Sequence, residues 1–193
     1  LSGKEVRLDW LAENASGETF HVYTIDNGKV SVGVGRNPRK TYDDADTVVV
    51  TLDNGQKITC TPDHRFMLRD GTYAEACNLA PGTSLMPLYR KVTTKDDMRD
   101  RLVGYEMYWC PSDSCWHFTH RMVGSWKYGS VYNRGSGGHV IHHVYADKLN
   151  NDPNMLLLMT PDAHSAVHAR DITVRRSDPA FEARRLSNFL KYC

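Results

Sequence analysis

The chain has 193 residues, a formal net charge of +1 and a hydrophobic fraction of 40%. This length suits one large or two small domains, and the apolar content is sufficient for hydrophobic cores. No apolar run approaches membrane-spanning length and the first residues lack the pattern of a signal peptide, so we expect no membrane partner.

The first ninety residues have the pattern of successive β-hairpins. Asn-Gly between runs of β-branched residues is the strongest short hairpin signal. Asn27-Gly28 and Asn54-Gly55 each separate two such runs, and Asp70-Gly71 marks a third turn. The sequence therefore predicts a mostly-β domain over residues 1–90.

A short motif, Thr61-Pro-Asp-His64, follows the second hairpin, and the run Leu79-Ala-Pro-Gly-Thr-Ser-Leu85 comes after the third turn. Together these residues resemble the second conserved splicing block of inteins, which have the Hint fold. The resemblance implies that His64 destabilises the first scissile peptide bond and assists an N-to-S acyl shift, while Thr61 hydrogen-bonds nearby. A Thr-x-x-His motif alone would be only a loop after a strand, so the hairpins around it are essential to the identification.

Both ends of the chain depart from the intein pattern. Inteins begin with a nucleophilic Cys or Ser and end on His-Asn, whereas this chain begins Leu1-Ser2, ends Tyr192-Cys193 and contains no His-Asn pair. We therefore expect no splicing from the chain as given. The resemblance implies the N-terminal portion of an intein, or half of a split intein, without its C-terminal Hint part. A complementary C-terminal intein fragment is then an implied partner.

Residues 91–138 connect this region to a second motif. Residues 91–100 suit a linker or a short helix, and Tyr105–Trp109 and Trp116–Val123 have strand character, the second running into a short helix. Tryptophans at such positions are more often core residues than platforms for nucleic-acid bases.

The cysteines do not form a disulfide framework. Their odd number favours a reducing compartment. Cys110 and Cys115 lie on either side of a predicted turn, but zinc needs four ligands and no second cysteine pair is near. We therefore favour structural thiols, with His117 and His120 as the nearest further ligands if zinc is bound.

Four histidines follow in a regular order. His142-His143 end one apolar segment, and a turn-rich stretch and a second apolar run lead to Thr160-Pro161, a favourable N-cap and first helical residue. Positions four apart share a helix face, so His164 and His168 point the same way. The pattern predicts a strand, loop, strand, helix unit that gathers imidazoles around one divalent cation.

Residues 139–170 resemble the HNH endonuclease motif, a ββα-metal fold, and are closest to the homing-endonuclease type. The resemblance implies that His143 is the general base and that Asn154 is the loop Asn counted with the catalytic residues. It also implies three metal ligands, His142, His164 and His168. Two departures are Met155 where Leu is usual, and His142 where many relatives have Asp or Asn.

Histidine suits the implied chemistry. Phosphodiester hydrolysis needs a water deprotonated near neutral pH and a cation that stabilises charge on the phosphate and the departing oxygen. We expect one divalent metal, Mg or Mn, with Zn or Ni as alternatives because imidazoles suit them. Double-stranded DNA is the implied substrate, and the context is cytoplasmic, prokaryotic or phage-type.

The last segment contains two arginine pairs, Arg175-Arg176 and Arg184-Arg185, in a half of the chain that is slightly basic. They either follow a DNA backbone or form a solvated face, and the sequence favours neither.

The expected fold class is α+β, with a Hint-like β domain over residues 1–90 and an HNH domain over residues 91–193. The expected function is that of an intein-associated homing endonuclease. The alternative is a protein-splicing element whose nuclease is inactive or accessory, and a third reading is a DNA-binding module without catalysis.

Overall fold

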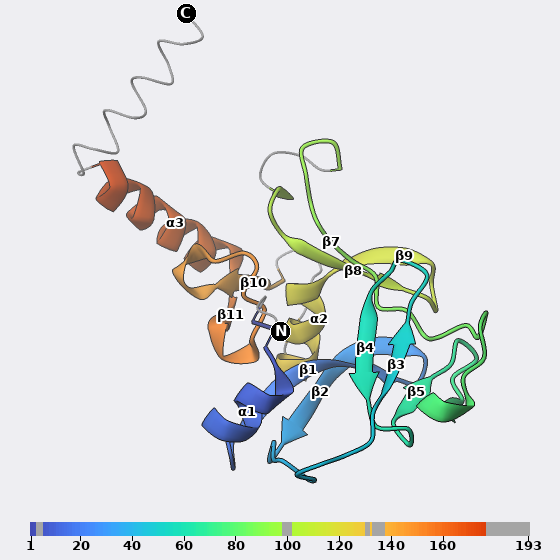
Figure 1. The fold of residues 1–193 in the computed structure, drawn as a ribbon. Helices are drawn as coiled ribbons and strands as arrows, with labels where there is room; N and C mark the ends of the chain where they lie inside the picture. The colour runs from blue at the N-terminus through green and yellow to red at the C-terminus, as the bar shows by residue number, and fades with distance from the viewer. Residues whose placement is uncertain (3–5, 98–101, 130–131, 133–137, 177–193) are drawn as a thin grey trace, which may run out of the picture. The chain divides into compact units, whose positions relative to one another are not determined.

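The computed structural model describes residues 1–2, 6–97, 102–129, 132 and 138–176, the last six of these by their backbone alone. Contacts divide the chain into two compact units, Leu1–Thr119 and His120–Cys193. Short antiparallel sheets and three α-helices make the described part an α+β fold, which confirms the expected class (Figure 1). No helix within these ranges is long and apolar enough to cross a membrane.

The first unit consists mainly of hairpins. Its elements are α1 (Leu8–Asn14), β1 (Thr19–Asp26), β2 (Lys29–Arg36), β3 (Val48–Thr51), β4 (Lys57–Cys60), β5 (Arg65–Met67), β6 (Tyr73–Glu75), the short 3-10 helix η1 (Ala76–Asn78), β7 (Arg90–Val92), β8 (Glu106–Cys110) and β9 (Cys115–Phe118). Strands β1 and β2, β3 and β4, and β5 and β6 form three two-stranded sheets, and β7, β8 and β9 form a three-stranded sheet. All three hairpins predicted from the sequence are present.

The β1–β2 hairpin shows why the turn residues matter. Asp26 pairs with Lys29, so Asn27 and Gly28 form a two-residue turn, and both have positive φ, 49° and 74°. This is the turn that Asn-Gly favours because glycine adopts left-handed conformations without strain. Further along, a Cβ on Gly35 would lie 2.4 Å from the ring of Phe20, so close cross-strand packing also requires glycine there.

A polar cluster lies where β1 meets the three-stranded sheet. The Tyr23 hydroxyl donates to the Glu106 carboxylate, and Arg90 Nη1 lies 3.2 Å from the other carboxylate oxygen. Burial is the main cause that raises the pKa of Tyr23, and the hydrogen bond to Glu106 acts in the same direction. These contacts are internal to the first unit, and they bind β1 to β7 and β8.

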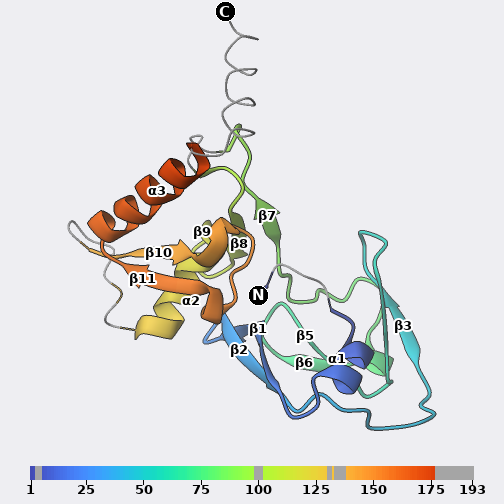
Figure 2. The same ribbon diagram turned by 90° about the vertical axis from the view of Figure 1, so that its left-hand side faces the viewer.

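The second unit contains β10 (Val140–His143), the 3-10 helices η4 (Val144–Ala146) and η5 (Pro153–Met155), β11 (Leu156–Met159) and α3 (Pro161–Arg176), together with α2 (Thr119–Tyr128), which begins at the unit boundary. The β10–β11 hairpin lies between α2 and α3 (Figures 1 and 2). The predicted order of strand, loop, strand and helix is therefore confirmed. The Thr160 hydroxyl accepts from the Ala163 amide at 3.3 Å and caps α3 as expected.

Helix α2 supports the hairpin and its loop. Val123 and Leu156 are fully buried, and a Cβ on Gly124 would lie 2.5 Å from the Ile141 side chain, so the helix packs closely on β10. Lys127 Nζ donates to the carbonyl oxygens of Pro153 and Leu156, at 2.6 and 3.0 Å. The chain entering β11 is thus held by α2.

The two compact units meet at residue 119, whereas the sequence motifs place the domain boundary at residue 90. The β7–β8–β9 sheet belongs to the first unit by its contacts, although no hairpin signal in the sequence joins it to residues 1–90. The division into a Hint-like part and an HNH part remains a prediction.

Candidate metal centre

Three histidines of the second unit converge. His142 is in β10, and His164 and His168 are on one face of α3. Ring centroids are 5.2 Å apart for His142 and His164, 5.3 Å for His142 and His168, and 4.4 Å for His164 and His168. One ring nitrogen from each lies within 4.8 Å of the other two. The structure therefore brings together the three residues predicted as metal ligands.

The local fold explains the convergence. Strand β10 pairs with β11, α3 begins directly after β11, and α3 contacts β10. The i,i+4 spacing then places two imidazoles over His142, with the Nε2 atoms of His164 and His168 only 3.1 Å apart. His142 is buried, whereas solvent reaches the two helix residues.

The protonation state of His164 suits metal binding. Burial is the main cause that lowers the pKa of His164, and the neighbouring His168 and His142 lower it further. A lowered pKa keeps imidazole neutral near pH 7, and the neutral form is the one that ligates a metal. Ligand nitrogens around a tetrahedral ion lie about 3.3 Å apart, so small side-chain rotations would suffice. The residues present fit a divalent cation with coordination positions left for water or a substrate oxygen.

His143 is in a different environment from its neighbour. It is 5% exposed, its Nε2 lies 3.1 Å from Asn151 Oδ1, and its ring makes an edge contact with His120 at 5.1 Å between centroids. Burial is the main cause that lowers its pKa, while the hydrogen bond with Asn151 acts in the opposite direction. The predicted base is thus held apart from the three-histidine set.

Asn151 fixes the tautomer of that base. Its amide nitrogen Nδ2 donates to the Leu149 carbonyl at 3.1 Å, so Oδ1 is the acceptor that faces His143. The Nε2 of His143 must then donate, which puts the ring's lone pair on Nδ1. Asn151 is itself fully buried, so this arrangement is firmly held.

Asn154, which the resemblance counts with the catalytic residues, lies in the 3-10 helix η5. Its side chain is exposed, and its backbone amide donates to Asp152 Oδ1 at 2.9 Å within η5. Sequence reasoning missed Asn151 because three asparagines, at positions 150, 151 and 154, lie in one loop. Only their burial distinguishes them.

The predicted splicing residues lie in the first unit. Thr61 and His64 form one turn between β4 and β5, in which the His64 amide donates to the Thr61 carbonyl at 3.0 Å. The His64 ring is exposed and meets Phe66 edge-on, with centroids 5.1 Å apart. The motif is formed as a turn, and its role in splicing stays a prediction.

The arginine pairs give less information. Arg175 and Arg176 lie in the last turn of α3, where only the backbone is described, and Arg184 and Arg185 lie outside the described residues. Their predicted contact with DNA stays a prediction.

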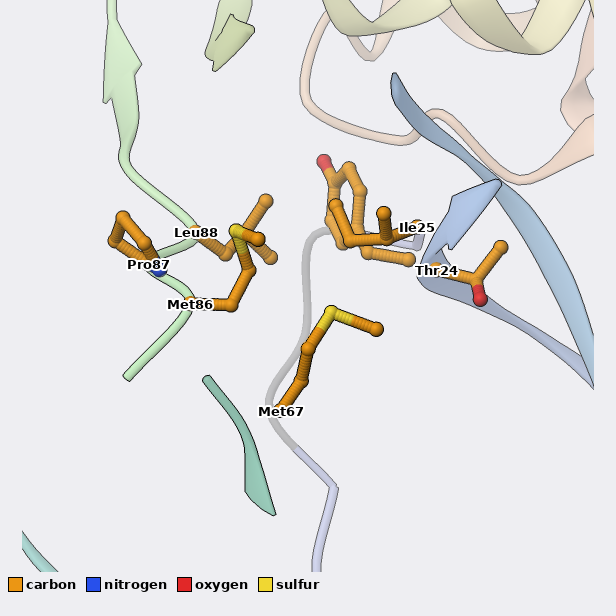
Figure 3. Close-up of a pocket in the computed structure, with 7 residues that line it drawn as sticks. Thr24, Ile25, Met67, Met86, Pro87 and Leu88 are labelled. Atoms are coloured by element: carbon orange, nitrogen blue, oxygen red, sulfur yellow. The ribbon is translucent and has the colours of Figure 1, made fainter. Parts of the chain in front are cut away.

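A cavity of about 260 Å³ in the first unit is lined mostly by apolar side chains. Figure 3 shows Met86 and Leu88 facing Ile25 and Met67 across it. Tyr23 is the titratable residue among those that line it, and its hydroxyl is occupied by Glu106.

Comparison with known proteins relates the chain to part of a longer protein. The chain is 40% identical, over 194 aligned positions, to a protein named as the B subunit of DNA gyrase, from Synechocystis sp. (strain ATCC 27184 / PCC 6803 / Kazusa). The match covers 95% of this chain and 17% of that protein. No family model matches the chain, and no solved structure matches it.

Proposed function

We propose that the second unit is a metal-dependent DNA endonuclease of the HNH type and that the chain is part of an intein-associated homing endonuclease. The observation that carries this proposal is the meeting of His142, His164 and His168, with a fourth histidine, His143, directly after His142 in β10. Three imidazoles with open coordination positions and one separately buried imidazole provide a metal site and a base.

The chain's own residues account for the proton transfer. His143 would take a proton from water through Nδ1, because Asn151 holds the proton on Nε2. His120 packs against the ring and restricts its rotation. The divalent cation, when bound by the three histidines, would stabilise negative charge on the phosphate and on the departing oxygen.

The ligand atoms bear on which cation is bound. Magnesium prefers oxygen ligands, and the described set offers three imidazole nitrogens. Imidazole suits Mn, Ni and Zn, and Mn is common to the sequence expectation and the ligand chemistry. We therefore propose manganese as the cation to test first, with magnesium in parallel.

The similarity to part of a gyrase-named protein supports a DNA context and the intein setting. Almost the whole chain matches a small part of a much longer protein. A self-contained element inserted in a longer host would produce this relation. The hairpins and the Thr61–His64 turn of the first unit fit the Hint-like part of such an element.

The test is metal-dependent cleavage of plasmid DNA. The substrate is a supercoiled plasmid that carries the gene segments flanking the matching region in the relative, with that region removed. We expect nicked or linear product with Mn or Mg and none with chelator. His143→Ala should reduce the rate by about 10²–10⁴-fold while the fold, followed by circular dichroism, and metal binding stay intact.

Matched controls separate the roles. His142→Ala and His164→Ala should weaken metal affinity as well as cleavage, whereas His64→Ala, an exposed change in the first unit, should leave cleavage unchanged. Cleavage by His143→Ala at the wild-type rate would remove this residue from the mechanism. Plasmid binding without cleavage under every metal condition would leave only a DNA-binding module.

A splicing element remains the second candidate, because the Thr61–His64 turn is present. The measurement is splicing of a longer chain, in which the reading frame of this chain's gene is extended in both directions. Ligated flanking sequences that disappear in a His64→Ala variant would support this candidate.

A further inference from the structure

The tip of the β8–β9 hairpin in the first unit contains a second group of metal-ligating side chains. Cys110, Asp113 and His117 each place one ligand atom within 4.8 Å of the other two. Cys110 is 5% exposed, while Asp113 is exposed and His117 is half-buried. The group contains sulfur, unlike the three-histidine set.

The hairpin register adds a second thiol. Cys110 and Cys115 are direct partners across the hairpin, so their side chains lie on one face, as do those of the next pair on that face, Tyr108 and His117. Directly opposed Cβ atoms are about 4.5–5.5 Å apart. Cys115 is exposed, so rotation of its side chain would bring a fourth ligand to the group without moving the backbone.

The carboxylate is already oriented for binding. The Cys115 amide donates to Asp113 Oδ1 at 3.2 Å, and the other oxygen, Oδ2, lies 2.7 Å from His117 Nε2. Cys110 Sγ lies 3.1 Å from the Ser112 hydroxyl and thus faces the same loop.

We propose that the β8–β9 hairpin binds one zinc ion through Cys110, Asp113, Cys115 and His117. Two thiolates, one imidazole and one carboxylate, all ligand types that zinc accepts, supply the four ligands of a closed tetrahedral site. Thiolate ligands select zinc over magnesium or manganese. The ion would link β8 to β9 at the end of the hairpin where a four-residue turn also connects them. Binding would release the thiol protons.

The inference is independent of the proposed nuclease. His120, the other histidine that the sequence offers as a zinc ligand, instead packs on His143. Tyr108 stacks on His117, with ring centroids 5.7 Å apart, and restricts that ring from behind. The ligands thus come from one hairpin, β8–β9 and its turn.

Cobalt substitution tests the site specifically. The full chain is reduced with a phosphine, stripped with chelator and titrated with Co²⁺ and then with Zn²⁺. Thiolate ligation gives a sulfur-to-cobalt charge-transfer band in the near ultraviolet, which three imidazoles cannot produce. We expect this band at one cobalt per chain, and we expect Zn²⁺ to abolish it.

Variants decide which residues bind. Cys115→Ser and His117→Ala change accessible side chains, so the fold should persist, and each should remove the band or weaken cobalt affinity by about tenfold or more. Cys60→Ser and Cys77→Ser are the matched controls and should keep the band. Absence of the band in the reduced wild-type chain, or an unchanged band with unchanged cobalt affinity in Cys115→Ser and His117→Ala, would overturn the proposal. Loss of the band in the two controls would overturn it as well.

Discussion

At the scale of single residues, Asn151 decides how His143 can act. Asn151 is buried, and its Nδ2 donates to a backbone carbonyl. Its side-chain oxygen Oδ1 therefore accepts from Nε2 of the histidine. A rotated or flipped amide would leave a buried polar atom unpaired, which costs about 1–3 kcal/mol. Under the proposed function, Asn151 is therefore a positioning residue that acts through His143.

Replacing this asparagine should affect turnover more than binding. We expect Asn151→Ala to lower kcat of DNA cleavage, to leave KM nearly unchanged and to destabilise the protein by about 1–3 kcal/mol, because a buried hydrogen bond is lost. Asn154→Ala, in the same loop but exposed, is the control. Steady-state cleavage and denaturant unfolding measure both effects. Equal losses for the two variants would contradict a positioning role for Asn151.

The burial of His143 predicts a pH dependence of cleavage. Burial holds the pKa of His143 below its ordinary value of 6.5, and only the neutral ring accepts a proton. The cleavage rate should therefore fall as pH drops through this lowered pKa, so that more than half of the plateau rate remains at pH 6.5. Asn151→Asp would place a negative charge beside the ring, raise the pKa and move the acid limb to higher pH. An acid limb that stays in place in this variant would argue against His143 as the base.

At the scale of elements, α2 holds the β10–β11 hairpin through close packing at a glycine. A Cβ on Gly124 would lie 2.5 and 2.6 Å from two carbons of the buried Ile141 side chain. The hairpin carries His142 and His143, so the position of α2 sets the position of the centre.

Gly124→Ala should therefore destabilise the second unit. Overpacking costs about 1–3 kcal/mol, which offsets the roughly 1 kcal/mol that alanine gains in helix propensity. Ser125→Ala, an exposed change in the same helix, is the control. Combining Gly124→Ala with Ile141→Ala tests the cause, because the double variant should lose less stability than the two single losses added together. Additive losses in thermal unfolding would exclude this contact as the reason.

At the scale of the whole molecule, two different ligand sets lie in two different compact units. Among the described residues, the set in the second unit consists of three imidazoles, and the set in the first consists of thiols with an imidazole and a carboxylate. Softer thiolate ligands and nitrogen ligands differ in the cations they select. The two sites should therefore respond to different metals.

Manganese should stabilise the chain through the three-histidine set. A cation at a hundredfold excess over its Kd adds about 2.7 kcal/mol to the unfolding free energy, since it binds the folded form only. This gain should disappear in His164→Ala and persist in Cys115→Ser. Thermal unfolding with manganese and with chelator gives the comparison. Stabilisation that survives in His164→Ala would place the manganese elsewhere.

The sequence alone was sufficient for features that depend on neighbouring residues. Asn27-Gly28 predicted a turn that the structure contains, and Thr160-Pro161 predicted the start of α3. The spacing of His164 and His168 predicted a shared helix face because the helical repeat fixes it. Each of these patterns operates within a few residues, where backbone geometry leaves few choices.

Only the tertiary structure decided which loop asparagine reaches His143. It also decided that Asp113 lies with Cys110 and His117 at one hairpin tip. Neighbouring asparagines have the same local preferences, so burial, which depends on the path of the whole loop, is what separates Asn151 from Asn154. Likewise, cross-strand register, not spacing along the chain, sets Cys115 opposite Cys110. Contacts of this kind form when the strands pair, and no pattern within a single segment specifies them.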